Sequence, residues 1–300
     1  MSFNIYFYCF LRALDVCAHN SACKDTNFFS NILTFLRKNE KKVHFYSKNG
    51  FFLQKKYYLC SVKAKIMAIG NVTPDSFYAA SRLVSDEVVA WAEKALNEGA
   101  DILDIGACST RPGSTPAEEA EEWRRLEPAL GALKEALPEA CLSLDTFRPE
   151  IARRALGQFG SMIINDISGG CEAMYEVVRA YGVPYIWTLR GQLDLPVQRP
   201  EMNDIDLILD PGFGFIGSTE GDYECLRKMD SLRTFGRPVL VGVSRKSMVW
   251  RPLGLTPDTS LTATQALQLY ALEHGATILR THDVKETKQI TTLFELIDNR

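Results

Sequence analysis

Polar and charged side chains recur along this chain where short apolar runs end. Four of them offer carboxylate, amide and ammonium groups, namely Asp145, Asn165, Asp210 and Lys246. Carboxylate and amide groups exchange hydrogen bonds with a flat, nitrogen-rich heterocycle, and a lysine donates to the ring acceptors. This set of residues therefore predicts a binding site for such a heterocycle.

A second set carries positive charge and one further amide, in Asn71, Arg111, Arg280 and His282. Two arginines and a histidine suit a phosphate or diphosphate, because a guanidinium group can bind an oxyanion through two parallel hydrogen bonds. The amide oxygen of Asn71 suits a hydrated magnesium ion. We therefore expect a phosphate-bearing ligand and Mg²⁺ beside the heterocycle.

Each of these residues also has an ordinary structural explanation. An aspartate at a strand end often caps the next helix, and Asp145 stands just before the helical pattern of residues 149–160. Arg111 precedes a Pro-Gly turn, where a solvated surface charge is common, and His282 can be a satisfied histidine on a rim. The functional interpretation is favoured because so many such residues follow predicted strands.

These residues are positioned by an alternation of apolar runs and amphipathic segments that begins at Lys65. Near-continuous apolar runs of this length are typical of parallel strands covered on both faces. The predicted strands are 66–70, 102–105, 142–145, 162–165, 185–189, 207–210, 239–243 and 276–280. Amphipathic segments, most of them ending at a glycine, predict helices between them. The predicted helices are 86–100, 116–137, 149–160, 172–182, 220–236 and 259–275.

Eight strands alternating with helices predict a (β/α)₈ TIM barrel, and a doubly wound open sheet is the competing arrangement. Active sites of TIM barrels lie at the carboxyl ends of the strands, where the polar residues above should meet. Residues 191–206 depart from the pattern, because Pro196 and Pro200 oppose a full helix in this crossover. We expect a shortened or missing helix there, and only partial cover for the fifth and sixth strands.

Composition sets the remaining limits. The 300 residues carry a formal net charge of −3, which gives no general attraction to nucleic acid or membranes. The eight cysteines include no C-x-x-C pair, so zinc is unsupported, and their scatter fits reduced thiols in a cytoplasm. The apolar start of residues 1–60 is too short to span a bilayer and lacks the basic beginning of a signal peptide. We expect residues 1–60 to be a loosely ordered extension and residues 61–300 to be the barrel domain.

Seven segments, in their order along the chain, resemble the dihydropteroate synthases, a family of pterin-binding TIM barrels. They are NVTPDSF (71–77), STRPGS (109–114), LDTF (144–147), IINDISGG (163–170), DPGFGF (210–215), GVSRKS (242–247) and RTHD (280–283). The resemblance covers residues 65–297. It implies a transferase of folate biosynthesis that condenses 6-hydroxymethyl-7,8-dihydropterin diphosphate with p-aminobenzoate, giving 7,8-dihydropteroate and diphosphate.

The same resemblance implies a role for each site residue. Asn71 would help to hold Mg²⁺ and the diphosphate. The pterin would be held by Asp145, Asn165, Asp210 and Lys246. The p-aminobenzoate side would be shaped by Thr110, Arg111, Phe215 and Ser244, and the diphosphate would be bound by Arg280 and His282. We assign catalysis to Asp145, Asp210, Lys246 and Arg280, and we expect a cytoplasmic homodimer without a nucleic-acid or membrane partner.

Four features depart from the family pattern. Cys108 stands where the family usually has an acidic residue, and Thr188 replaces the histidine of an M-H-M-like motif. The triplet beginning at Ile216 lacks the family's lysine, with Gly217 in its place, and the fifth helix is reduced. A catalytically impaired or non-catalytic pterin-binding relative is therefore the alternative to an active synthase. A pterin-binding methyltransferase that serves a corrinoid is a third possibility, which NVTPDSF and the S-R-K tripeptide oppose.

Overall fold

The computed structural model describes residues 63–72, 81–108 and 117–297. The chain divides into two compact units, Met1–Tyr57 and Tyr58–Arg300, and the described residues belong to the second. The prediction of a loosely ordered extension over residues 1–60 lies outside the described residues. Within the described part of the chain, no helix combines the length and the hydropathy of a membrane span.

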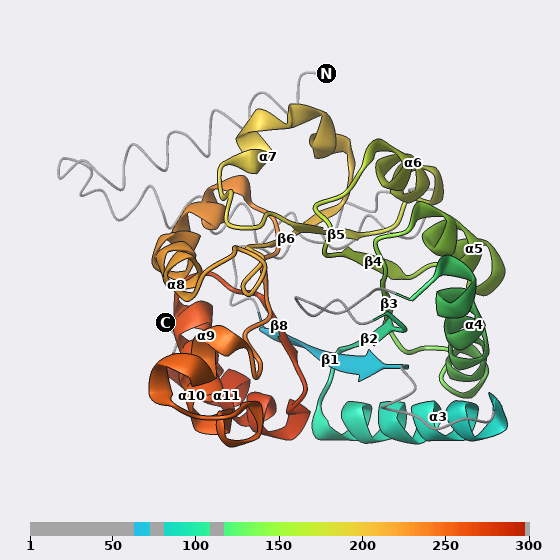
Figure 1. Cartoon of the computed structure of the whole chain (residues 1–300), viewed down its shortest axis with the longest axis horizontal. Coiled ribbons are helices and arrows are strands. Elements are labelled where there is room, and N and C mark those ends of the chain that lie inside the picture. Colours follow the sequence, from blue (N-terminus) through green and yellow to red (C-terminus); the bar gives the residue numbers. More distant parts are fainter. Residues whose placement is uncertain (1–62, 73–80, 109–116, 298–300) are drawn as a thin grey trace, which may run out of the picture. The chain divides into compact units, whose positions relative to one another are not determined.

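Eight parallel strands form the predicted barrel (Figure 1). They are β1 (Lys65–Asn71), β2 (Ile102–Gly106), β3 (Leu142–Asp145), β4 (Ile163–Asp166), β5 (Tyr185–Thr188), β6 (Leu207–Asp210), β7 (Leu240–Val241) and β8 (Ile278–Thr281). Their order is β6-β5-β4-β3-β2-β1-β8-β7. A parallel bridge between Leu209 and Val239 joins the two ends, where the Leu209 N–H donates to the Pro238 carbonyl at 2.8 Å. The TIM-barrel prediction is confirmed, and the open sheet is excluded.

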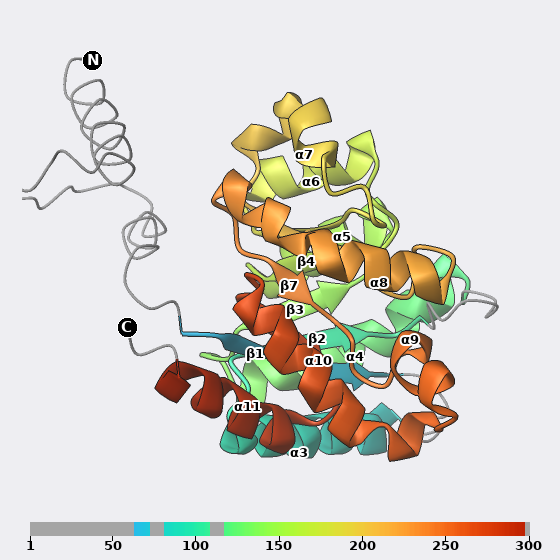
Figure 2. The ribbon, with the colours of Figure 1, turned by 90° about the vertical axis from the view of Figure 1, so that its left-hand side faces the viewer.

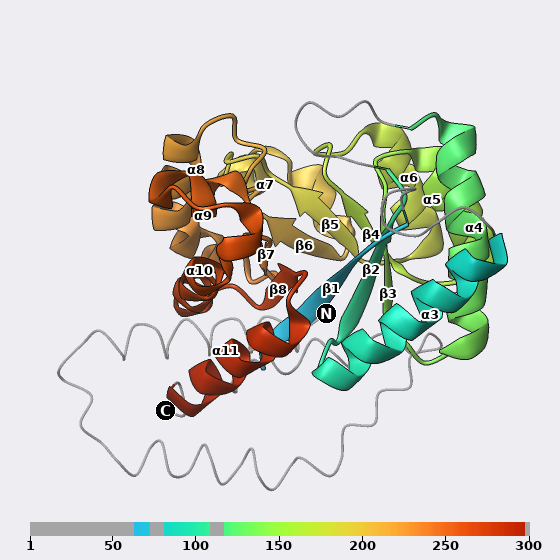
Figure 3. The same ribbon diagram turned by 60° about the horizontal axis from the view of Figure 1, so that its bottom comes forward.

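Helices surround this ring of strands. The longer ones are α3 (Ser81–Glu98), α4 (Glu119–Ala136), α5 (Pro149–Phe159), α6 (Glu172–Tyr181), α8 (Thr219–Lys228), α10 (Leu261–Glu273) and α11 (Val284–Ile297). Short helical turns follow α8 and β7, namely η3 (Met229–Phe235), α9 (Ser247–Trp250), η4 (Arg251–Leu253) and η5 (Pro257–Thr259). The helix α11, which the sequence pattern does not single out, lies beside α3 along β1 (Figure 2, Figure 3).

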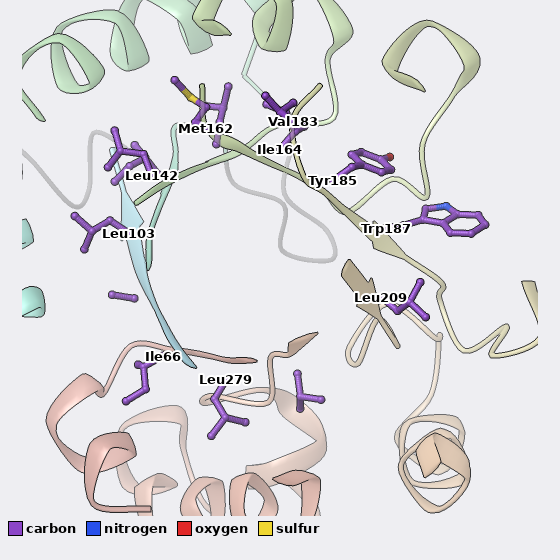
Figure 4. Close-up of a cluster of buried hydrophobic side chains, with 14 of the residues drawn as sticks. Ile66, Leu103, Leu142, Met162, Ile164, Val183, Tyr185, Trp187, Leu209 and Leu279 are labelled. Carbon is purple, nitrogen blue, oxygen red and sulfur yellow. The ribbon is translucent and has the colours of Figure 1, made fainter. Parts of the chain in front are cut away.

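The alternation of side chains along each strand separates two apolar clusters. Outward side chains such as Ile66, Leu103, Ile164 and Leu279 point away from the ring toward the helices (Figure 4). Inward side chains near the amino ends of the strands form the second cluster, which is Met67, Ile102, Ile163, Ile186, Ile208, Leu240 and Ile278. This second cluster, the barrel floor, fills the amino-terminal end of the barrel with apolar side chains. Any polar site inside the ring must therefore lie toward its carboxyl end.

The crossover between β5 and β6 is shortened as predicted, to α7 (Leu195–Gln198) and the 3-10 turn η2 (Pro200–Asp204). The expectation of partial cover is wrong. The outward side chains of β5 and β6 are at most 3% exposed, namely Tyr185, Trp187, Leu207 and Leu209. Met202 and Ile205 of the crossover are buried in the same cluster. Cover depends on apolar side chains, and this crossover supplies them without a full helix.

Candidate active site

A layer of polar side chains lies directly above the barrel floor. Alternate residues of a strand face the same side, so the positions two residues beyond the floor also point inward. The layer consists of Asp104 on β2, Ser143 on β3, Asn165 on β4, Thr188 on β5, Asp210 on β6 and Arg280 on β8. The side chain of Arg280 is 19% exposed, and the other five residues are buried. Six of the eight strands thus contribute a polar group to one place.

Asp104, which the sequence analysis does not single out, is the centre of this layer. Its carboxylate accepts hydrogen bonds from Ser143 Oγ at 2.6 Å, Asn165 Nδ2 at 3.0 Å and Arg280 Nε at 2.6 Å. A fully buried carboxylate is tolerated only with such partners, because burial removes its hydration. Asp104 therefore ties β2 to β3, β4 and β8. The sequence signal for it is one charged residue inside the apolar run ILDIG.

Arg280 lies between two carboxylates, since its Nη2 group also donates to Asp145 Oδ2 at 2.6 Å. Burial lowers the pKa of Arg280, but Asp104 and Asp145 outweigh burial and raise it. Burial raises the pKa of Asp145 to about 7, with Arg280 opposing the rise and Asp104 adding to it. The structure thus places Arg280, a residue of the predicted phosphate group, in contact with Asp145 of the predicted heterocycle site.

Three polar atoms of this region have no hydrogen-bond partner within the described residues. They are Asp145 Oδ1, Asn165 Oδ1 and Thr188 Oγ1, and all three atoms are buried. The orientation of the Asn165 amide follows from Asp104, because a carboxylate only accepts and so must face the amide nitrogen. The amide oxygen then faces the other way. Buried polar atoms are normally satisfied, so three unpaired atoms in one place indicate a ligand.

Lys246 and Asp210 carry the other opposite charges at the carboxyl end of the barrel, which we call the mouth, and the charge of each shifts the pKa of the other. The ammonium group of Lys246 donates to the Phe213 carbonyl and lies 4.8 Å from the centre of the Phe215 ring. Burial lowers the pKa of Lys246 to about 8, and Asp210 opposes that change. Burial also raises the pKa of Asp210, against the effects of Lys246 and of the Gly212 N–H, which donates to its carboxylate at 2.8 Å.

Hydrogen bonds join the loops that follow β7 and β8 at the rim of the barrel, where the carboxyl ends of the strands meet the loops. Ser244 Oγ lies 3.2 Å from His282 Nδ1 and accepts from the His282 backbone N–H at 3.2 Å. Arg245 adopts a φ of 55°, which is unfavourable for a residue with a side chain. Its guanidinium group makes two hydrogen bonds to Asp283, at 3.1 and 2.7 Å, which hold this conformation. Ser244 and His282 are thus presented together.

Of the remaining predicted site residues, the structure describes two and leaves two outside the described ranges. Asn71 is the last residue of β1, where it is half-buried and pairs with Gly106. It lies four residues beyond the inward-facing Met67, so the alternation along the strand directs it inward as well. Phe215 is half-buried beside Lys246. Thr110 and Arg111 lie outside the described residues. No cluster of three His, Cys, Asp or Glu side chains suited to a metal occurs in residues 63–72, 81–108 and 117–297.

The departures from the family pattern are locally accommodated. The side chain of Cys108 is buried just after β2. Gly217 has a φ of 104°, a conformation that glycine adopts readily. Ser218 follows it and caps α8, because its Oγ accepts from the Gly221 N–H at 3.0 Å. The altered triplet therefore begins a regular helix.

The fold and this mouth define a TIM-barrel enzyme with a buried polar binding site. A family model described as pterin binding enzyme matches residues 67–204 and 195–282. Dihydropteroate synthase of Escherichia coli K12 is 33% identical over 256 residues, which cover 77% of this chain and 90% of that protein. The Streptococcus pyogenes serotype M3 enzyme is 34% identical over 254 residues, covering 77% and 94%. This chain belongs to the dihydropteroate synthase family of pterin binding enzymes and is accordingly a transferase.

Solved structures support the same conclusion. Dihydropteroate synthase from Clostridium difficile in the presence of pteroic acid superposes with a TM-score of 0.73 at 29% identity, covering 79% of this chain and 98% of that one. The Xanthomonas albilineans enzyme with 4-aminobenzoic acid gives a TM-score of 0.71 at 32% identity, covering 79% and 94%. The resemblance drawn from the seven sequence segments is confirmed.

Proposed function

We propose that this chain joins 6-hydroxymethyl-7,8-dihydropterin diphosphate to p-aminobenzoate and releases 7,8-dihydropteroate and diphosphate. The observation that carries the proposal is the pair of buried, unpaired acceptors Asp145 Oδ1 and Asn165 Oδ1 on neighbouring strands. Unpaired acceptors require N–H donors, and a reduced pterin presents several N–H groups. The pteroic acid and 4-aminobenzoic acid named with related structures support this ligand class.

The reaction requires no nucleophilic side chain. The bond between the exocyclic methylene carbon of the pterin and the diphosphate oxygen breaks, and the electron pair leaves with diphosphate. The amine nitrogen of p-aminobenzoate forms the new bond to that carbon and releases a proton to solvent. The protein therefore contributes by orienting the two substrates and by stabilising charge on the departing oxyanion.

The layer above the floor supplies these contributions together with Asp145, Lys246 and His282, which lie beyond it. Asp145 and Asn165 accept from the pterin, and Lys246 donates to its ring acceptors. A guanidinium group has five N–H donors, of which Arg280 uses one for Asp104 and one for Asp145. The remaining donors of Arg280, together with His282 at the rim, supply positive charge and hydrogen bonds for the diphosphate.

The proposal includes a magnesium ion, for which Asn71 is the candidate protein ligand. Its amide oxygen is a ligand type that Mg²⁺ accepts, and the residue faces inward at the end of β1. The described residues contain no cluster of acidic ligands, so they fit an ion that arrives bound to the diphosphate and is held mainly by phosphate oxygens and water. When bound, the ion would stabilise negative charge on the departing diphosphate.

The test is turnover by the purified full-length chain with both substrates and Mg²⁺, measured as dihydropteroate formation and diphosphate release. The variant Lys246→Ala should abolish most of the activity. The control Lys228→Ala, which removes an exposed lysine paired with Glu224 on α8, should leave it intact. Pterin binding without turnover would instead establish the non-catalytic alternative, and a wild-type chain that binds no pterin would refute both functions.

The reduced crossover is one of the features that favour a non-catalytic relative, and the burial of Trp187 and Leu209 weakens that argument. We include a homodimeric state and a cytoplasmic location in the proposal. Sedimentation equilibrium of the purified chain tests the first, and fractionation of the native cells tests the second.

A further inference from the structure

Thr188 occupies the inward-facing end of β5, between the strands that carry Asn165 and Asp210. It is 1% exposed and stands opposite Asp210 in the β5–β6 register. Its Cγ2 methyl group lies against Gly212, where an added Cβ would come within 3.0 Å of it. The methyl group is therefore packed against the protein, while Oγ1 has no partner within the described residues.

The unpaired hydroxyl distinguishes Thr188 from the other buried threonines of the described chain. Thr146 donates to Glu122 at 2.7 Å, and Thr287 hydrogen-bonds Gln268 and Thr281. Thr291 donates to the Lys288 carbonyl at 3.1 Å. The hydroxyls of Thr264 and Thr281 also have partners, in the Arg245 N–H and Ser244 Oγ.

An apolar side chain of the same shape would satisfy the packing at Thr188 better than a threonine does. Valine would replace the hydroxyl by a methyl group and would remove an unpaired polar atom, which disfavours the folded state when buried. The packing among the described residues therefore gives no reason for a hydroxyl at this position. A ligand in the mouth does give one.

We infer that Thr188 is a further pterin-binding residue, whose hydroxyl hydrogen-bonds the polar edge of the ring beside the groups that contact Asn165 and Asp210. The inference rests on the proposed function, because it requires a pterin in this mouth. A hydroxyl both donates and accepts, so it can pair with a ring nitrogen, an N–H group or a carbonyl oxygen. Thr188 thus provides a polar contact of its own at the position where the family usually has histidine.

The inference predicts effects of opposite sign on stability and on binding. The variant Thr188→Val should leave the unfolding temperature of the free protein unchanged or raise it. The same variant should weaken 6-hydroxymethyl-7,8-dihydropterin by about three- to tenfold, the value of one neutral hydrogen bond. Thr188→Ser, which keeps the hydroxyl, should retain most of the affinity.

Calorimetry with 6-hydroxymethyl-7,8-dihydropterin and thermal unfolding of the full-length variants test this. The control is Thr291→Val on α11, which removes a buried hydroxyl that has a partner and should lower stability without changing pterin affinity. Unchanged affinity in Thr188→Val, or a loss of stability like that of the control, overturns the inference while the proposed function stands. If Thr188→Val fails to fold, the hydroxyl is structural and the inference is wrong. Absence of pterin binding by the wild-type chain overturns both.

Discussion

Removal of the Asp104 carboxylate should destabilise the barrel more than any surface charge substitution. In Asp104→Ala, Ser143 and Asn165 lose an acceptor, and Arg280 keeps only Asp145. Breaking a buried ion pair by removing one partner costs about 3–5 kcal/mol. For a domain of this size, 1 kcal/mol shifts the unfolding temperature by roughly 2–4 °C, so we expect a decrease of roughly 6–20 °C.

The variant Asp104→Asn should cost less than Asp104→Ala, and this order tests the hydrogen-bond network itself. An asparagine oxygen can still accept from Asn165 and Arg280, while its amide nitrogen donates to the Ser143 hydroxyl, which can reverse its role. Only the charge is lost.

Thermal and denaturant unfolding, followed by circular dichroism, measure both variants. The control is Glu121→Gln on α4, which removes the charge of a partly exposed ion pair with Arg124 and Arg125 and should shift the midpoint much less. Asp104 would not organise the layer if Asp104→Ala lowered the unfolding midpoint no more than the control does. The same conclusion would follow if Asp104→Asn and Asp104→Ala lowered the midpoint equally.

Three further predictions concern the mouth and the crossover. Lys246→Ala and Asp210→Asn should each greatly weaken pterin binding in calorimetry while the circular dichroism spectrum stays that of a folded barrel; unchanged affinity in both would refute the site. With a pKa of about 7 for Asp145 and about 8 for Lys246, pterin affinity should fall below pH 7, as the carboxylate acceptor is protonated, and above pH 8, as the ammonium loses its proton. The variant Lys246→Arg should abolish the alkaline limb of a titration, and its persistence would assign that limb elsewhere. Trp187→Ala should lower the free energy of unfolding by about 3–5 kcal/mol without changing pterin affinity, and a smaller loss would mean that the crossover packs loosely there.

The sequence identifies the strands and most of the polar residues that end them, because strand ends are visible as a change from apolar to polar residues. Asp145, Asn165 and Asp210 are found in this way. Asp104 is harder to recognise because it lies inside a run that is apolar on both faces. Such a run has no alternation to show which residues point inward. The inward direction becomes certain only once β2 is paired with its neighbours.

Contacts between side chains on opposite parts of the barrel also cannot be predicted from the spacing of residues in the sequence. Arg280 and Asp104 are 176 residues apart, and their contact exists only because β8 pairs with β1 and brings β2 close. The prediction that β5 and β6 are only partly covered is wrong for another reason. Prolines correctly exclude a helix from the crossover, but burial requires apolar side chains, and Met202 and Ile205 supply them.

The unpaired atoms also favour a protein that binds a polar ligand over one that has lost its binding function. Five buried side-chain atoms lack a partner within the described residues, and three of them lie in the mouth, on Asp145, Asn165 and Thr188. Each unpaired atom disfavours the free protein. An apolar replacement would relieve that cost at Thr188, whereas Asp145 and Asn165 also pair with Arg280 and Asp104 through their other side-chain atoms. The pairs with Arg280 and Asp104 explain why Asp145 and Asn165 are polar, but they do not explain why three unpaired atoms lie together above an apolar floor. A pterin that supplies their partners would stabilise the barrel as it binds, so stability and ligand recognition are coupled in this layer.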